Sequence, residues 1–180
     1  STAGQDLPED HFTFLRIKGS FVYENDFVPE YLWYSGIADR YILGDEIDPA
    51  QVTLINKVAG DITDPNARIM PFKLHVAMMP YDTVNNTLLQ PRTGGEGGLW
   101  TTFDWPSALA LGAQDTGLDF SGQYDFTETW MYWPTTHMVQ PVENALTCEA
   151  CHGAEGRLDW LALGYPGDPI NWGGRFSTTP

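Results

Sequence analysis

The sequence predicts a mostly irregular, loop-rich fold with a few α-helices and short β-strands. Glycine and proline contribute 18 and 13 of the 180 residues, and these residue types interrupt regular elements. Aromatic residues are also abundant, with 7 Trp, 8 Tyr and 9 Phe, which supply large rings to pack around a common centre. The length suits one domain with a core. We expect a polar extension over residues 1–10 and a single domain over residues 11–180.

Short strands are expected in the first third of the chain. Aromatic and β-branched residues alternate with polar ones within residues 12–34, and Gly19 breaks the pattern. Residues 51–59 indicate another extended pair. The X-Pro pairs between residues 64 and 80 and the glycine-rich loop 94–98 predict a largely irregular middle region.

Two helices are expected in the second half of the chain. Asp104 or Ser107 can cap the first, which Gly112 is expected to end. Pro141 suits the first turn of a second helix over residues 142–151. This second helix would carry the chain's two cysteines at its end.

The charge of the chain is strongly negative. Only 9 Lys and Arg oppose 24 Asp and Glu, for a formal net charge of -15. Nucleic acid is excluded as a partner because a phosphate backbone would be repelled. No apolar run approaches the ~18 residues of a transmembrane segment, and Ser1 opens the sequence without a basic, apolar leader.

The residues Cys148, Cys151 and His152 form the sequence C-x-x-C-H, which is typical of c-type haem attachment. Two thiols three positions apart can reach the two vinyl groups on one edge of a porphyrin. The imidazole that follows is then placed beneath the iron as an axial ligand. The pattern therefore predicts one covalent haem c, held by Cys148 and Cys151 with His152 as proximal ligand, around which the loop-rich fold is organised.

Three other sites share parts of this pattern. A structural zinc site needs four ligands, and the chain has no second C-x-x-C. A redox disulfide of this spacing normally follows a strand, and a structural disulfide across two residues is geometrically awkward. Carboxylate clusters such as Asp45 and Glu46 lack the spacing of an EF-hand loop, so we expect turns there rather than a calcium site.

The second axial ligand has several candidates. His75 lies in a loop-like stretch far from the motif in sequence, and we expect it to be the sixth ligand. His137 lies eleven positions before Cys148, and a helix over residues 142–151 would make it hard for that side chain to reach the opposite face of the same haem. A methionine ligand or an open sixth position is also compatible with the sequence.

The sequence resembles a known family over residues 11–168. It is similar to the C-terminal half of the octahaem tetrathionate reductase-type cytochromes. The matching stretches are residues 17–24 (IKGSFVYE), 33–36, 60–67, 71–75, 131–134, 137–139, the C-x-x-C-H motif, 156–160 and 162–168. The resemblance implies that His75 and His137 both face haems. In that family the reductase activity belongs to a lysine-ligated haem in the N-terminal half, and this chain has no counterpart of that half.

These observations predict a monohaem c-type cytochrome, a subunit or fragment related to multihaem cytochromes, that transfers electrons in the periplasm or outside the cell. It is expected to have no catalytic residue of its own. The competing hypothesis is a haem-dependent reductase of sulfur or nitrogen oxyanions such as tetrathionate, nitrite or hydroxylamine. The expected partner is a redox protein, either a multihaem cytochrome or a second copy of this chain. His137 is then an alternative ligand, or a ligand to a neighbouring haem.

Overall fold

The computed structural model describes residues 3–23, 26–136, 140–171 and 174–175. Helices make up 15% of this part of the chain and strands 28%, so the predicted loop-rich fold is confirmed. The strands are β1 (Phe14–Leu15), β2 (Gly19–Ser20), β3 (Glu30–Tyr34), β4 (Ala38–Arg40), β5 (Thr53–Leu54), β6 (Asn56–Val58), β7 (Arg68–Asp82), β8 (Thr87–Leu88) and β9 (Tyr124–Pro134). The α-helices are α1 (Leu99–Thr102) and α2 (Trp105–Thr116), and three 3-10 helices follow: η1 (Val142–Asn144), η2 (Cys148–Ala150) and η3 (Pro169–Asn171).

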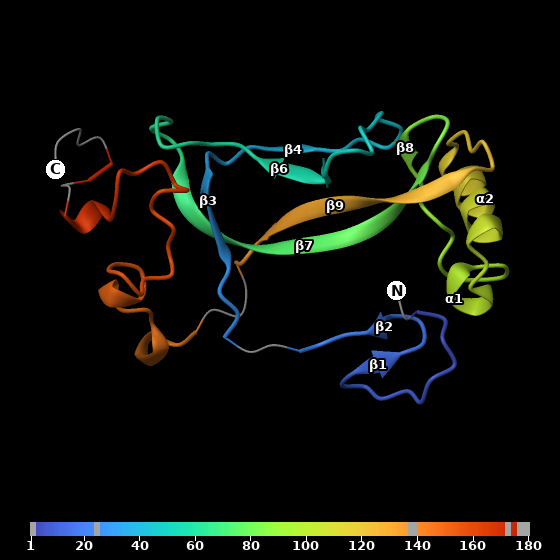
Figure 1. Ribbon diagram of the computed structural model, residues 1–180, viewed down its shortest axis with the longest axis horizontal. Coiled ribbons are helices and arrows are strands. Elements are labelled where there is room, and N and C mark those ends of the chain that lie inside the picture. The colour runs from blue at the N-terminus through green and yellow to red at the C-terminus, as the bar shows by residue number, and fades with distance from the viewer. Residues whose placement is uncertain (1–2, 24–25, 137–139, 172–173, 176–180) are drawn as a thin grey trace. The chain divides into compact units, whose positions relative to one another are not determined.

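The largest sheet of the described residues has the strand order β3-β7-β9-β5, and β8 pairs with the end of β7. Its two long strands, β7 and β9, lie next to each other in this order and run side by side in Figure 1. Strand β3 is antiparallel to β7, with Trp33 opposite Ile69. Two small sheets, β1-β2 and β4-β6, complete the strand pairing.

The chain divides into two compact units, and β7 and β9 contribute residues to both. Unit 1 comprises Ser1–Phe27, Ile42–Thr53 and Ala77–Thr129, and unit 2 comprises Val28–Tyr41, Leu54–Val76 and Trp130–Pro180. The cysteines and histidine of the C-x-x-C-H motif lie in unit 2.

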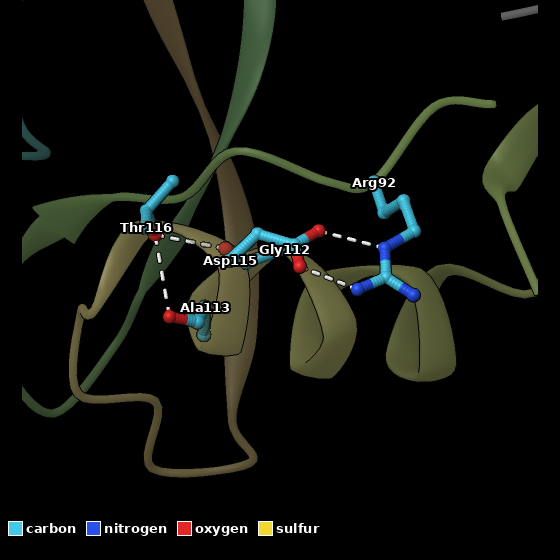
Figure 2. Close-up of polar contacts among 5 residues, drawn as sticks. All are labelled: Arg92, Gly112, Ala113, Asp115 and Thr116. Atoms are coloured by element: carbon cyan, nitrogen blue, oxygen red, sulfur yellow. Dashed lines mark hydrogen bonds and ion pairs between the residues drawn. The ribbon is translucent and has the colours of Figure 1, made fainter. Parts of the chain in front are cut away.

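Helix α2 is the longest helix of unit 1 and begins as the sequence predicts. The Asp104 side chain caps it by accepting a hydrogen bond from the backbone N–H of Ser107. The helix then runs past Gly112, where the sequence had placed its end. Figure 2 shows the last turn, in which the Thr116 hydroxyl donates to the carbonyl of Gly112 at 2.8 Å.

An ion pair joins this helix to the segment that precedes it. Arg92 donates from Nε to Asp115 Oδ2 at 2.7 Å, and its Nη2 pairs with Oδ1 of the same carboxylate (Figure 2). Leu109 of α2 is fully buried, as are Leu88 and Leu89 in the segment after β7. None of the helices in the described part of the chain is long and apolar enough to cross a membrane.

Unit 2 has an aromatic core at the sheet. Phe72 is 1% exposed, and Tyr34 and Tyr132 present their edges to it, with ring centroids at 5.8 Å and 6.4 Å. Edge-to-face rings stabilise one another beyond the area they bury. This core holds β3 in place, and with it Trp33, which contacts Tyr165 and Leu163.

Two local expectations from the sequence are wrong. The X-Pro pairs at Pro71 and Pro80 do not make residues 68–82 irregular, because both prolines lie within strand β7. Residues 142–151 do not form an α-helix but contain the two separate 3-10 turns η1 and η2. Val142 and Leu146 are 87% and 53% exposed, so a helix here would bury no apolar face to support it.

Candidate haem-attachment site

The C-x-x-C-H motif lies on the short turn η2 and the residues that follow it. The backbone N–H groups of Cys151 and His152 both donate to the carbonyl of Cys148, at 3.1 Å and 2.9 Å. Both cysteines are free thiols, with Cys148 exposed and Cys151 half-buried. Both sulfurs are therefore available for a bond to another group.

The chain folds back beneath the motif directly after it. Arg157 donates its backbone N–H to the carbonyl of Ala150 at 3.0 Å. Gly156 is packed so closely in this return that an added Cβ would lie 2.6 Å from the carbonyl oxygen of Cys151. Only glycine fits there without displacing the backbone of the motif, since real Cβ contacts are longer than this.

The His152 ring is held from its edge and from one face. Its Nδ1 lies 2.6 Å from Asp168 Oδ1, and the Trp160 ring stacks on it, with centroids 5.0 Å apart and planes 16° apart. A carboxylate only accepts, so this contact assigns the proton to Nδ1. Within the described residues Nε2 has no hydrogen-bond partner, and its lone pair is directed away from Asp168.

The Asp168 carboxylate has further donors. Oδ2 accepts from the backbone N–H of Gly153 at 2.7 Å, and Oδ1 also accepts from that of Ile170 at 3.0 Å. Burial acts to raise the pKa of Asp168, but the hydrogen bonds from Gly153, Ile170 and His152 outweigh burial and lower that pKa below its ordinary value. The group therefore stays an anion beside the imidazole.

A series of aromatic rings links the motif to the sheet of unit 2. Trp160 meets Tyr165 edge to face at 5.4 Å, and Tyr165 stacks on Trp33 of β3 at 6.1 Å. Trp33 in turn donates from Nε1 to the carbonyl of Leu163 at 2.8 Å. The position of His152 thus depends on a strand more than one hundred residues earlier in the chain.

Trp33 is also in contact with Arg175. The Arg175 guanidinium lies 4.1 Å from the centroid of the Trp33 ring. It also donates to the carbonyls of Ile62 at 2.7 Å and Ala67 at 2.9 Å. A cation over an aromatic face is favourable, and here it also joins the loop after β6 to the ring series.

Two buried N–H donors near the motif have no acceptor within the described residues. They are Arg157 Nε and Trp160 Nε1, and unpaired buried donors are costly. Arg157 also lines a cavity of about 600 Å³ between β3 and the segments 57–62 and 157–164. A haem brings both an apolar ring and propionate carboxylates that accept hydrogen bonds. The free thiols, the unpaired Nε2 and these donors fit that cofactor.

The structure does not bring His75 into contact with His152. His75 lies on strand β7, where its side chain is exposed, and not in a loop as its surroundings in sequence indicate. No hydrogen bond or ring contact joins it to His152 in the described residues. In the part of the chain that the structure describes, no group of three or more His, Cys, Asp or Glu side chains gathers as it would around a metal ion.

His137 lies outside the described residues. A helix over residues 142–151 would keep its side chain from the opposite face of the haem, but the described residues there form the two 3-10 turns η1 and η2 instead. Eleven residues of extended chain span up to about 36 Å, so distance along the chain does not exclude this histidine. Its role stays a prediction, as does that of His75.

Asp168 and Trp160 are the site residues that reasoning from spacing alone missed. Both lie in the stretches 156–160 and 162–168 that resemble the octahaem cytochromes, so the resemblance did contain a signal. It gave no role for either, because an aspartate between glycine and proline is equally typical of a turn.

Comparisons with known proteins identify the family of this chain. A family model described as bacterial cytochrome c matches residues 3–155, a range that includes the motif. The structure is similar to that of an octaheme cytochrome c from Shewanella oneidensis, with a TM-score of 0.84 and 44% sequence identity over 95% of this chain. The matched part is 42% of that longer chain. A search of curated proteins found no match. The length of the family match, together with the motif it contains, shows that this chain belongs to the bacterial cytochrome c family, whose cofactor is a covalently bound haem c.

Proposed function

We propose that this chain is an electron-transfer protein that carries one haem c, bound covalently through Cys148 and Cys151 with His152 as an axial ligand. The observation that carries the proposal is the state of His152. Its Nδ1 is taken by Asp168 at 2.6 Å, which leaves Nε2 to face an iron. Neutral imidazole with its second nitrogen hydrogen-bonded to a carboxylate is the usual state of a metal-ligating histidine.

Each residue of the site has a defined part in this function. Cys148 and Cys151 would hold the cofactor edge through two thioethers, each formed by adding a thiol to a vinyl group, without a deep pocket. His152 offers the Nε2 lone pair, while Asp168 and Trp160 keep the ring from turning. When bound, the haem supplies a one-electron change between two iron oxidation states. No proton transfer or substrate chemistry is needed from the protein.

The number of haems is tested by intact mass and a pyridine haemochrome assay on protein made in cells that attach haem c. One haem per chain is expected, because both cysteines belong to a single motif. A variant with Cys148→Ala and Cys151→Ala together is expected to have the mass of the bare polypeptide. Wild-type protein with that same bare mass would contradict the proposal.

His75 is proposed as the sixth ligand, supported by its exposed position on β7, which leaves the imidazole accessible. His75→Ala is expected to open the iron, so that the reduced protein gains a high-spin component and binds carbon monoxide. The matched control is His11→Ala, since His11 is also exposed and has no proposed role. If both variants keep the wild-type spectrum, the sixth ligand is another residue, and His137 becomes the next to be replaced.

The same spectra separate electron transfer from reduction of sulfur or nitrogen oxyanions. A closed site with two imidazoles gives sharp low-spin bands that cyanide and nitrite leave unchanged, and its potential is lower than that of a His/Met site. We place the protein in the periplasm or outside the cell, with a multihaem cytochrome or a second copy of this chain as its redox partner. The match to 42% of an octaheme chain supports a partner that holds further haems.

A further inference from the structure

The Asp168 carboxylate joins three segments around the motif. It accepts from the side chain of His152 at 2.6 Å, from the backbone of Gly153 at 2.7 Å and from that of Ile170 at 3.0 Å. Its side chain is 13% exposed, and that of His152 is 28% exposed. Water competes little for an acceptor that is both largely covered and fully engaged.

The hydrogen bond between Asp168 and His152 is not needed to hold the loop in place. The bonds from the backbone of Gly153 to Oδ2 and from that of Ile170 to Oδ1 already fix the turn at η3. The bond from Nδ1 is different because it ties an anion to the ring that ligates the iron. A hydrogen bond to an ionised acceptor is about twice as strong as one between neutral groups.

An anion on Nδ1–H shifts electron density in the imidazole toward Nε2 and makes that atom a better donor to iron. A better donor stabilises the more highly charged ferric state more than the ferrous state. We propose that Asp168 lowers the reduction potential of the haem by acting through His152, as a positioning and tuning residue. This inference rests on the proposed function, since it takes His152 as the ligand.

The structure offers a matched control for the effect of charge. Glu155 is exposed, lies three residues after His152 and has no hydrogen bond to it. Glu155→Gln and Asp168→Asn therefore each remove one negative charge near the motif, but only the second weakens the bond to Nδ1. Asp168→Glu keeps the anion and serves as the conservative variant.

The experiment is a spectroelectrochemical titration of the haem-loaded full chain at one fixed pH. Relative to Glu155→Gln, Asp168→Asn is expected to favour the reduced form by at least tenfold, which is about 59 mV for one electron. Asp168→Glu is expected to return the potential toward the wild-type value. A shift in Asp168→Asn that is no larger than that of the control would overturn the inference.

If Asp168→Asn takes up no haem, a measurement on the wild type can test whether Asp168 acts on His152. The Nδ1 proton of an iron-bound His152 gives a hyperfine-shifted NMR signal, and slow exchange with deuterium is expected if Asp168 holds it. Rapid exchange would overturn the inference. If the wild-type protein binds no haem, both the proposed function and this inference are wrong. If the wild type binds haem but Asp168→Asn has the same reduction potential as Glu155→Gln, only the inference is wrong.

Discussion

Asp82 ends strand β7 with a carboxylate that has no exposed surface. Its Oδ1 accepts hydrogen bonds from the backbone of Val84 at 2.8 Å and Asn85 at 3.0 Å, and from the hydroxyl of Ser121 at 2.9 Å. Its Oδ2 accepts from the backbone N–H of Ser121 at 2.6 Å. The carboxylate thus connects the turn between β7 and β8 with the segment that leads into β9, within unit 1.

Replacement of this group is expected to cost stability in proportion to the bonds lost. In Asp82→Asn the amide oxygen can keep the role of Oδ1, while the amide N–H₂ faces the N–H of Ser121 and cannot accept from it. Loss of one hydrogen bond to a charged group, with a donor left unpaired, is expected to cost about 3 kcal/mol. Asp82→Ala removes every acceptor, and we expect about 4 kcal/mol, limited because Val84 lies at the surface and its N–H can turn to water.

Urea unfolding of the haem-loaded protein measures both variants. The matched control is Asp119→Asn, which removes the same charge from an exposed side chain of unit 1 and is expected to change stability by less than about 0.5 kcal/mol. An Asp82→Asn variant as stable as this control would refute the reasoning from hydrogen bonds.

Acidification provides a second check on Asp82. Burial acts to raise its pKa, but the hydrogen bonds from Ser121, Asn85 and Val84 together lower the pKa below its ordinary value. Because the folded-state pKa is the lower one, this stabilisation is complete above the unfolded pKa of about 3.9 and is lost as the pH falls through the folded-state value. The advantage of wild type over Asp82→Asn should therefore shrink in acid. An advantage that stays constant would count against the carboxylate as its source.

Two glycines give further predictions. In Gly112→Ala the new Cβ would lie 1.8 Å from the carbonyl oxygen of Gln90, so we expect a loss of about 3 kcal/mol in urea unfolding. In Gly156→Ala the new Cβ would lie 2.6 Å from the carbonyl oxygen of Cys151, and the ratio of haem absorbance to protein should fall because the motif is displaced. Gly94→Ala is the control for both, since no atom lies within 4 Å of its added Cβ. A Gly156→Ala variant with full haem content would show that the motif tolerates the shift.

For helix α2, local signals in the sequence predicted the first residues of the helix better than its last residues. Asp104 caps α2 as predicted because its bond to Ser107 involves neighbours only. Gly112 predicts the end of this helix, yet the helix continues to Thr116. The reason for that glycine is tertiary, since the backbone of Gln90 approaches too closely for any side chain. Residues 104–116 alone do not contain this information.

In strand β7, local sequence signals predicted irregular structure where the structure has a regular strand. Pro71 and Pro80 predicted irregular structure because proline lacks the N–H that a sheet uses. In the structure their carbonyls still accept, from Thr135 at 3.1 Å and from Leu89 at 2.9 Å. The sheet therefore tolerates both prolines, and His75 between them lies on a strand rather than in a loop.

In the candidate haem site, some residues can be predicted from neighbouring sequence, whereas others depend on contacts between distant parts of the chain. The five consecutive residues of the C-x-x-C-H motif make Cys148, Cys151 and His152 stand out from sequence alone. The orientation of the imidazole depends on a carboxylate sixteen residues later. The chain has 24 acidic residues, and spacing offers no reason to choose Asp168 among them. That choice requires the fold, in which the series from Trp33 to Trp160 fixes the segment that brings Asp168 back to His152. The motif thus indicates the class of cofactor, while the contacts that orient the proposed ligand depend on the folded chain.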